Sequence, residues 1–287
     1  SIFAPGWKKT LMTATPFSDC DSMCSMSLTV VVMPRSLVVV MRRSISSADR
    51  PLYCQISEMT GMSIGGKTSV GMRRMLSEQR DEYYYLTLMN ENYPMPEMPE
   101  GSRDGILKGM YLFRDAGKAK KGELRVQLLG SGTILREAIF AAELLDKDFG
   151  VSADIWSCPS FNELRRDGFD AERHNRMHPE DPPRAAYVEQ CLKGRAGPAI
   201  AATDYVRAFA DQIRAFVPMH YTVLGTDGFG RSDTRSNLRR FFEVDRYYIA
   251  HAAIAALAAE GKLSATDVTR AIKMYNIDPD KANPVDV

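Results

Sequence analysis

One segment near the start of the chain has the residue types and spacing of a phosphate-binding loop. Residues 61–68 read GMSIGGKT and fit the pattern G-x-x-x-x-G-K-[ST]. In such a loop the backbone N–H groups and the lysine hold phosphates while the threonine hydroxyl binds Mg²⁺. That role would fall to Gly66, Lys67 and Thr68. Such a loop also needs a buried strand before it, and residues 51–60 make a poor core strand. The pattern therefore has two interpretations, a P-loop nucleotide-binding protein or a chance match.

A second loop with chemically useful side chains lies in the last quarter of the chain. Asp227, Arg231 and Ser232 belong to a stretch with two glycines, directly after an apolar run at 221–224. Sheets of α/β domains carry functional loops at the carboxyl ends of their strands. The glycines permit a tight backbone path, and Arg231 could pair with a carboxylate. The other interpretation is a subunit-interface loop without chemistry.

The cysteines favour neither a metal site nor a disulfide framework. Cys20 and Cys24 are separated by three residues, but no second ligand pair follows at zinc-site spacing. The five cysteines are an odd and scattered set. We therefore expect no metal site and a reducing compartment, with a cytoplasmic location.

The elements that would position these loops are clearest in the second half of the chain. Short apolar runs alternate there with helical patterns, which predicts an α/β domain with a mostly parallel sheet and flanking helices over residues 124–287. The predicted strands are 124–129, 153–157, 199–202 and 221–224, and the predicted helices are 134–149, one after 161, 205–217, 247–260 and one from 265.

Two of these helices carry further signals. Ser264 with Asp267 three residues later is the N-terminal capping pattern of the last helix. The helix at 247–260 is apolar around most of its girth, which is typical of burial on several sides. It is either a self-association surface or a central core helix.

Composition limits the function classes and divides the chain. The 287 residues hold 37 Lys+Arg and 36 Asp+Glu, a balance that argues against nucleic acid as a partner. No apolar run reaches the ~18–20 residues of a membrane span, so we expect no membrane partner. Residues 1–70 have seven of the 16 methionines. Short strands are predicted at 29–32 and 37–40, but elsewhere in this stretch the apolar residues keep no sustained helical or strand period. We expect residues 1–70 to be poorly specified, and we expect the Pro- and Lys-rich residues 94–123 to be an interdomain linker.

Six segments of the chain share their sequence with one known family. They are residues 83–101, 126–132, 160–168, 202–205, 224–233 and 275–284. Together they resemble the homodimeric bacterial pyruvate dehydrogenase E1 component, and the resemblance runs from about residue 72 to the C-terminus. It implies that residues 71–93 are the end of a pyrimidine-binding domain and that residues 124–287 are a transketolase-like C-terminal domain. Glu91 and Asn92 would then hold the linker through side-chain-to-backbone bonds.

The resemblance implies a thiamine-diphosphate enzyme of pyruvate metabolism. Such an enzyme decarboxylates pyruvate and reductively acetylates the lipoyl group of its partner E2, the dihydrolipoyl acetyltransferase. The family holds thiamine diphosphate and Mg²⁺ through motifs that this sequence does not show, so no catalytic, cofactor-binding or metal-binding residue carries over. We therefore expect a fragment of a homodimeric enzyme that binds no cofactor and is inactive alone. A non-catalytic dimerisation module is the third alternative.

The first 70 residues do not share this resemblance. The match, the charge balance and the Met and Ser content all change at about residue 71. We therefore expect residues 1–70 to be a frame-shifted or mis-joined version of the second domain, in which the P-loop pattern would be accidental.

Overall fold

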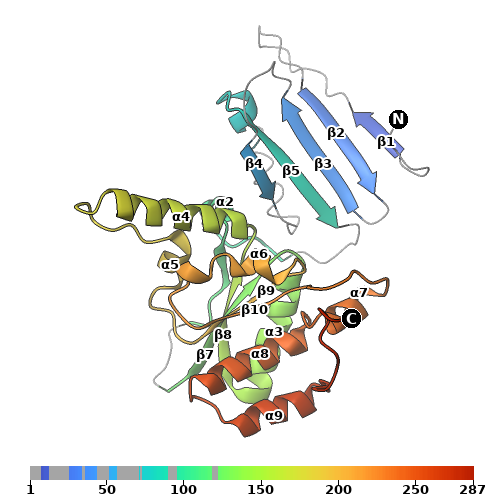
Figure 1. Ribbon diagram of the computed structural model, residues 1–287, viewed down its shortest axis with the longest axis vertical. Helices are drawn as coiled ribbons and strands as arrows, with labels where there is room; N and C mark the ends of the chain where they lie inside the picture. Colours follow the sequence, from blue (N-terminus) through green and yellow to red (C-terminus); the bar gives the residue numbers. More distant parts are fainter. Residues whose placement is uncertain are drawn as a thin grey trace. The chain divides into compact units, whose positions relative to one another are not determined.

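The computed structural model describes residues 8–12, 26–33, 36–43, 52–56, 71, 73–89, 96–117 and 122–287 (Figure 1). The chain divides into two compact units, Ser1–Met98 and Pro99–Val287. No helix in these described ranges is long and apolar enough to cross a membrane.

The first unit contains a five-stranded sheet with the order β1-β2-β3-β5-β4. Its strands are β1 (Lys8–Met12), β2 (Met26–Met33), β3 (Ser36–Arg43), β4 (Leu52–Ile56) and β5 (Glu82–Met89). All neighbours pair antiparallel except β4 and β5, which are parallel. The short strands predicted at 29–32 and 37–40 are confirmed inside β2 and β3, whose runs of valine suit a pleated backbone.

The second unit is built on a mostly parallel sheet with the order β10-β9-β7-β8-β6. β7 (Leu124–Gly130), β8 (Val151–Ser157), β9 (Ala199–Ala202) and β10 (Tyr221–Leu224) run parallel. At one edge β6 (Tyr111–Arg114) pairs antiparallel with β8. The predicted α/β class is confirmed, and β9 and β10 have the bounds that the sequence predicted.

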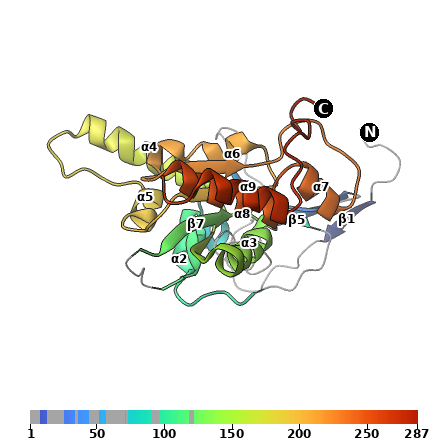
Figure 2. The same ribbon diagram turned by 90° about the horizontal axis from the view of Figure 1, so that it is seen from below.

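Helices cover both faces of this sheet (Figures 1 and 2). One apolar core joins the sheet to α3 (Ile134–Phe149), α8 (Arg246–Ala259) and α9 (Ala265–Met274). The core of the other face joins it to α4 (Phe161–Met177), α5 (Tyr187–Leu192) and α6 (Arg207–Asp211). The short helix α7 (Arg235–Phe241) precedes α8. The helix predicted over 205–217 is divided into α6 and a 3₁₀ turn at Arg214–Phe216, which together bury Ala210 and Ile213 in that second core.

Helix α8 is the central core helix of the unit. Ile249, Ala253, Ile254 and Leu257 are fully buried in the first core, and α3 and α9 pack against the helix. Its apolar girth is therefore explained by packing within one chain, and self-association stays a prediction.

The predicted linker 94–123 needs correction, because part of it belongs to the second unit. That unit begins at Pro99, and it includes α2 (Arg103–Lys108) as well as β6. Ile106, Met110 and Tyr111 are buried. These apolar residues hold the segment against the domain, although the surrounding prolines and lysines conceal the pattern.

The chain order creates a switch point between β7 and β9. From β7 the chain passes through α3 to β8 on one side, and it then returns through α4 and α5 to β9 on the other side of β7. The carboxyl ends of β7 and β9 therefore diverge into connections on opposite faces of the sheet. In open α/β sheets this is the usual position of a ligand site.

Candidate functional site

The carboxyl ends of β7, β9 and β10 are joined by a set of hydroxyl groups. The Thr203 hydroxyl lies 3.4 Å from the Ser131 hydroxyl, linking the ends of β9 and β7. The Thr226 hydroxyl, after β10, donates to the backbone carbonyl of Asp204 at 2.6 Å. These bonds fix the loop backbones that form the floor of the site.

Asp204 is the acidic residue at this switch point. Its Oδ2 accepts a long hydrogen bond, 3.4 Å, from the Thr133 hydroxyl. Its Oδ1 is buried and has no hydrogen-bond partner among the residues that the structure describes. A buried carboxylate oxygen without a donor is unfavourable and calls for an explanation.

A buried carboxylate beside the site orients two arginines. Glu137, in the first turn of α3, is 5% exposed. It accepts 2.9 and 3.2 Å bonds from the Arg246 guanidinium and a 3.3 Å bond from Arg239. Arg239 also lies 3.5 Å from the Thr133 hydroxyl. The carboxylate thus ties α7 and α8 to the start of α3 and holds the Arg239 guanidinium beside Thr133, whose hydroxyl donates to Asp204.

A cavity of about 280 Å³ lies over these residues. Its wall contains three arginines and one carboxylate, together with Thr226, two glycines and apolar side chains. The residues are Asp204, Thr226, Gly228, Gly230, Arg231, Arg235, Leu238, Arg239, Phe242 and Val244. Guanidinium groups in such a wall can bind an anion such as a carboxylate or phosphate.

The structure places the predicted loop residues around this cavity but gives each a different position. Asp227 Oδ1 accepts a 2.9 Å bond from the Arg207 N–H and so fastens the loop to the start of α6. Arg231 lines the cavity. Ser232 is exposed and lines a neighbouring cavity of about 330 Å³ together with Arg231.

The expected pairing of Arg231 with a carboxylate is not observed. Its guanidinium lies over the ring of Phe241, 4.1 Å from the centroid. No carboxylate within the described ranges forms an ion pair with it. The aromatic face of α7 holds this side chain by a cation–π contact instead, which sequence spacing could not reveal.

The remaining predicted residues lie outside the described part of the chain. This applies to Glu91 and Asn92 and to the phosphate-loop candidates Gly66, Lys67 and Thr68. Strand β4 precedes the phosphate-loop pattern. It lies within residues 51–60, which the sequence analysis judged a poor core strand.

Sequence reasoning missed the residues that define the site, above all Asp204, Glu137 and Arg239. Asp204 had a weak signal, because it follows the predicted strand 199–202 by two residues, but many ordinary turn residues share that position. Glu137 and Arg239 lie within helices, where nothing in the sequence pattern marks them.

A thiamine diphosphate centre holds its cofactor through a bound Mg²⁺, which needs several oxygen ligands. Among the described residues, no three His, Cys, Asp or Glu side chains lie together in a way that could hold a metal ion.

The thiols of the second unit do not resemble nucleophiles. Burial raises the pKa of the Cys158 thiol far above its ordinary value. Burial also raises the pKa of the Cys191 thiol. Both thiols therefore stay protonated at neutral pH, and the reactive form of cysteine is the thiolate.

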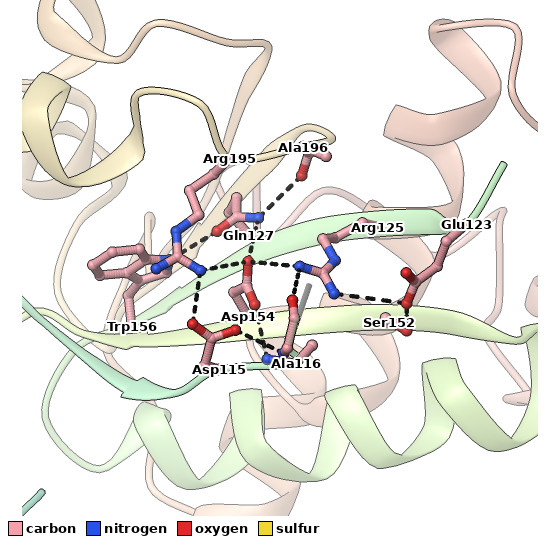
Figure 3. Close-up of polar contacts among 11 residues, drawn as sticks. Asp115, Ala116, Glu123, Arg125, Gln127, Ser152, Asp154, Trp156, Arg195 and Ala196 are labelled. Atoms are coloured by element: carbon pink, nitrogen blue, oxygen red, sulfur yellow. Dashed lines mark hydrogen bonds and ion pairs between the residues drawn. The ribbon is translucent and has the colours of Figure 1, made fainter. Parts of the chain in front are cut away.

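A second polar network fills the amino-terminal half of the sheet (Figure 3). At its centre Asp154, fully buried on β8, accepts bonds of 2.9 Å from the Gln127 side-chain amide and from the Ala116 N–H. Arg195 approaches the same carboxylate at 3.4 Å. Each oxygen of Asp154 therefore has a partner.

The network continues outward from Asp154 to the segment after β6. Arg125, 4% exposed, lies 3.8 Å from the Asp154 carboxylate and donates to the Gly117 carbonyl at 2.6 Å. Arg195 also pairs with Asp115 at 3.1 Å. None of the network's residues lines the 280 Å³ or the 330 Å³ cavity at the carboxyl ends of the strands. It therefore has the character of a structural clamp between β6, β7, β8 and the turn before β9.

Comparison with known proteins identifies the domain. Residues 109–245 match the transketolase-like TK C-terminal domain family. Together with the parallel sheet and its flanking helices, this match shows that the chain contains a transketolase-like C-terminal domain.

The curated relatives give a narrower similarity. The chain is 61% identical over 217 residues to the pyruvate dehydrogenase E1 component of Cupriavidus necator. It is 57% identical over 217 residues to that of Pseudomonas aeruginosa and 51% identical over 216 residues to that of Escherichia coli K12. These matches cover about three quarters of this chain, which confirms the resemblance seen in the sequence. The chain spans 24% of the length of each relative.

Solved transketolase structures are more distant. A transketolase from Campylobacter jejuni is 18% identical with a TM-score of 0.39, covering 67% of this chain and 24% of the other.

Proposed function

We propose that this chain supplies the transketolase-like C-terminal domain of a thiamine-diphosphate-dependent pyruvate dehydrogenase E1 component. The whole enzyme would decarboxylate pyruvate and transfer the resulting acetyl group, with reduction, to the lipoyl group of a dihydrolipoyl acetyltransferase. The observation that carries the proposal is the 61% identity over 217 residues, in a segment that folds around two well-formed cores.

The proposal divides the work between this chain and the rest of such an enzyme. Thiamine diphosphate supplies the electron sink for decarboxylation, and the described residues hold no ligand set for its Mg²⁺. The C-terminal domain would provide a stable scaffold and the polar site at the carboxyl ends of its strands. The assembly would be a cytoplasmic homodimer, with a second copy of the enzyme and the acetyltransferase as partners.

The test is an activity assay on the purified chain. Pyruvate-dependent reduction of ferricyanide, with thiamine diphosphate and Mg²⁺ added, should show no turnover above the protein-free blank. Turnover would mean that the chain holds its own catalytic centre, and the division of work proposed above would be wrong.

A nucleotide titration tests the alternative function. Calorimetry with Mg-ATP should show no binding in the micromolar range. Micromolar binding that is lost in Lys67→Ala would instead favour the P-loop protein.

A further inference from the structure

We infer that the segment after α9, residues 276–285, is a strap that holds α7 and the loop 225–233 in place, and with them one wall of the 280 Å³ cavity. Strap, loop and α7 would then open and close as one unit. The end of the chain lies beside α7 in both views (Figures 1 and 2). The inference concerns contacts within the second unit alone, so it does not depend on the proposed function.

Helix α7 needs such a support because none of its seven residues is buried. A helix this short gains little stability from its own backbone hydrogen bonds and depends on tertiary contacts. Arg235 and Arg239 of α7 line the cavity, together with Arg231 from the loop. Glu137 holds Arg239 from the side of α3, and the strap holds the other end of the helix. Whatever fixes α7 therefore also fixes this wall of the cavity.

The first argument is that α7 and the strap satisfy each other's helix ends. Lys281, in the strap, donates from Nζ to the carbonyl of Phe241, the last residue of α7, at 2.7 Å. In return, Arg240 donates to the carbonyl of Tyr275, which caps α9, at 2.9 Å, and to the carbonyl of Asn276. The last carbonyls of a helix have no partner within the helix, and basic side chains both bond them and interact favourably with the helix dipole. These bonds are lost if the two segments separate.

The second argument is the fit of the strap against the loop. Gly228 has a φ of +101°, and a Cβ there would lie 2.1 Å from the Pro284 carbonyl oxygen. The loop therefore requires glycine at this place, and the two backbones are in direct contact. Pro284 is the only buried residue of the segment 278–285. The strap thus spends its one buried side chain where it covers the loop.

The third argument is that the strap can open without unfolding the sheet. Ile277 is buried in the first core, and from there to Pro284 the strap is exposed or half-exposed. Between these two points Lys281 is the anchor, since it pairs with Glu243 at 3.0 Å and lies 5.3 Å from the ring centroid of Tyr248. Segments with few buried apolar contacts open at a lower free energy than the core does. The strap therefore acts as a latch on the cavity wall.

The experiment is hydrogen exchange of the full chain, followed by mass spectrometry of peptides from residues 225–242, from the strap and from β7. Lys281→Met keeps an unbranched side chain and removes the donor to the Phe241 carbonyl. It should speed exchange in residues 225–242 about tenfold, because a hydrogen bond from a charged group has been lost. Exchange in β7 should stay at the parent rate.

Two further variants complete the test. Lys262→Met is a matched change at a lysine that pairs with Glu260 at 2.7 Å, just after α8. It should leave all three regions unchanged. Gly228→Ala alters only the loop, yet it should speed exchange in the strap, because coupling between two segments is reciprocal. The strain of alanine at a positive φ should make this effect about tenfold as well.

Four results would overturn the inference. One is a Lys281→Met variant in which residues 225–242 keep the parent exchange rates. Another is an equal acceleration in Lys262→Met, which would show a general effect of lost charge. The third is a Gly228→Ala variant whose strap exchanges as in the parent. The fourth is an acceleration of β7 by the same factor, which would place the strap in the cooperative core. Pyruvate turnover is not measured here, so failure of this inference is distinguishable from failure of the proposed function.

Discussion

The two ends of the parallel sheet each hold a carboxylate among arginines, but the two carboxylates differ in how completely they are hydrogen-bonded. At the amino end, Asp154 has partners on both oxygens, although Nε and Nη2 of the neighbouring Arg125 are buried without a hydrogen-bond partner among the described residues. At the carboxyl end, the Asp204 carboxylate itself has one oxygen without a hydrogen-bond partner there, and Asp204 lines a cavity together with three arginines. Side chains of the same types therefore make a clamp at one end and an incomplete site at the other.

This contrast shows how to distinguish structural from functional charge in a domain without ligands. A buried charge whose hydrogen bonds are all made stabilises the fold only while every partner is present. A buried charge with a missing partner next to open space costs stability, and a ligand can offset that cost. The comparison therefore predicts a large loss of stability when Asp154 is replaced and little change when Asp204 is replaced.

The largest effect is expected at the amino end. Asp154→Ala should lower the free energy of unfolding by about 3–5 kcal/mol, because it removes the negative charge beside the buried Arg125 guanidinium and one acceptor of the Gln127 amide. Urea denaturation followed by circular dichroism measures this change. Asp146→Ala, at an exposed position on α3, is the control and should stay within about 0.5 kcal/mol of the parent. Equal effects of the two substitutions would contradict the clamp.

A smaller loss of stability is expected when Glu137, the carboxylate that binds Arg239 and Arg246, is replaced. Glu137→Gln should lower the free energy of unfolding by about 2–3 kcal/mol. The effect is smaller than at Asp154 because Arg246 is 34% exposed and can be solvated. The same denaturation experiment applies. An unchanged stability would mean that Glu137 does not hold α7 and α8 to α3.

Asp204→Asn should change the free energy of unfolding by less than about 1 kcal/mol, in either direction. The substitution removes a charge whose Oδ1 has no partner in the described structure, so little is lost. A loss of the size expected for Asp154→Ala would show that Asp204 is a structural residue, and the difference between the two ends of the sheet would disappear.

The smallest effect concerns pH and Asp115, at the rim of the clamp. The hydrogen bond from the Gly117 N–H, assisted by Arg195, lowers the pKa of this half-exposed carboxyl. A folded-state pKa below the unfolded value of about 3.9 contributes stability at pH values above 3.9. That contribution is lost as the pH falls through the folded-state pKa.

Asp115→Asn should therefore be slightly less stable than the parent at pH 7, by less than about 1 kcal/mol because the pair is solvated. The difference between the urea midpoints of the two proteins should shrink as the pH is lowered from 7 into the acid range. A difference in urea midpoint that grows as the pH is lowered would contradict a lowered pKa of Asp115 in the folded state.

Much of the second unit could be predicted because its signals are local. The bounds of β9 and β10 follow from short apolar runs between polar residues. The cap of α9 is confirmed: Ser264 Oγ accepts from the Asp267 N–H at 3.3 Å, and Asp267 accepts from the Ser264 N–H at 3.1 Å. Patterns of this kind involve neighbours in sequence, which a single chain displays directly.

The candidate site could not be predicted because it depends on strand order. Asp204 meets Thr133, 71 residues earlier, only because β9 returns to the side of β7 away from β8. Arg239 meets Glu137 across 102 residues for a similar reason. Hydrophobic periodicity predicts the strands and helices but not the order of the strands in the sheet. The sequence could therefore single out Asp227 and Arg231 on a glycine-rich loop, but it could not show that Asp204 and Glu137 lie at the same end of the sheet.

The central claim is that this chain carries a working E1 C-terminal domain. It is tested most directly by a chimera in which residues 71–287 replace the matching C-terminal segment of the Cupriavidus necator E1 component. With thiamine diphosphate and Mg²⁺, the chimera should reduce ferricyanide in a pyruvate-dependent reaction, within about tenfold of the rate of the intact relative. A matched chimera with Asp154→Ala should be less stable to heat. A soluble, folded chimera without pyruvate turnover would contradict the claim.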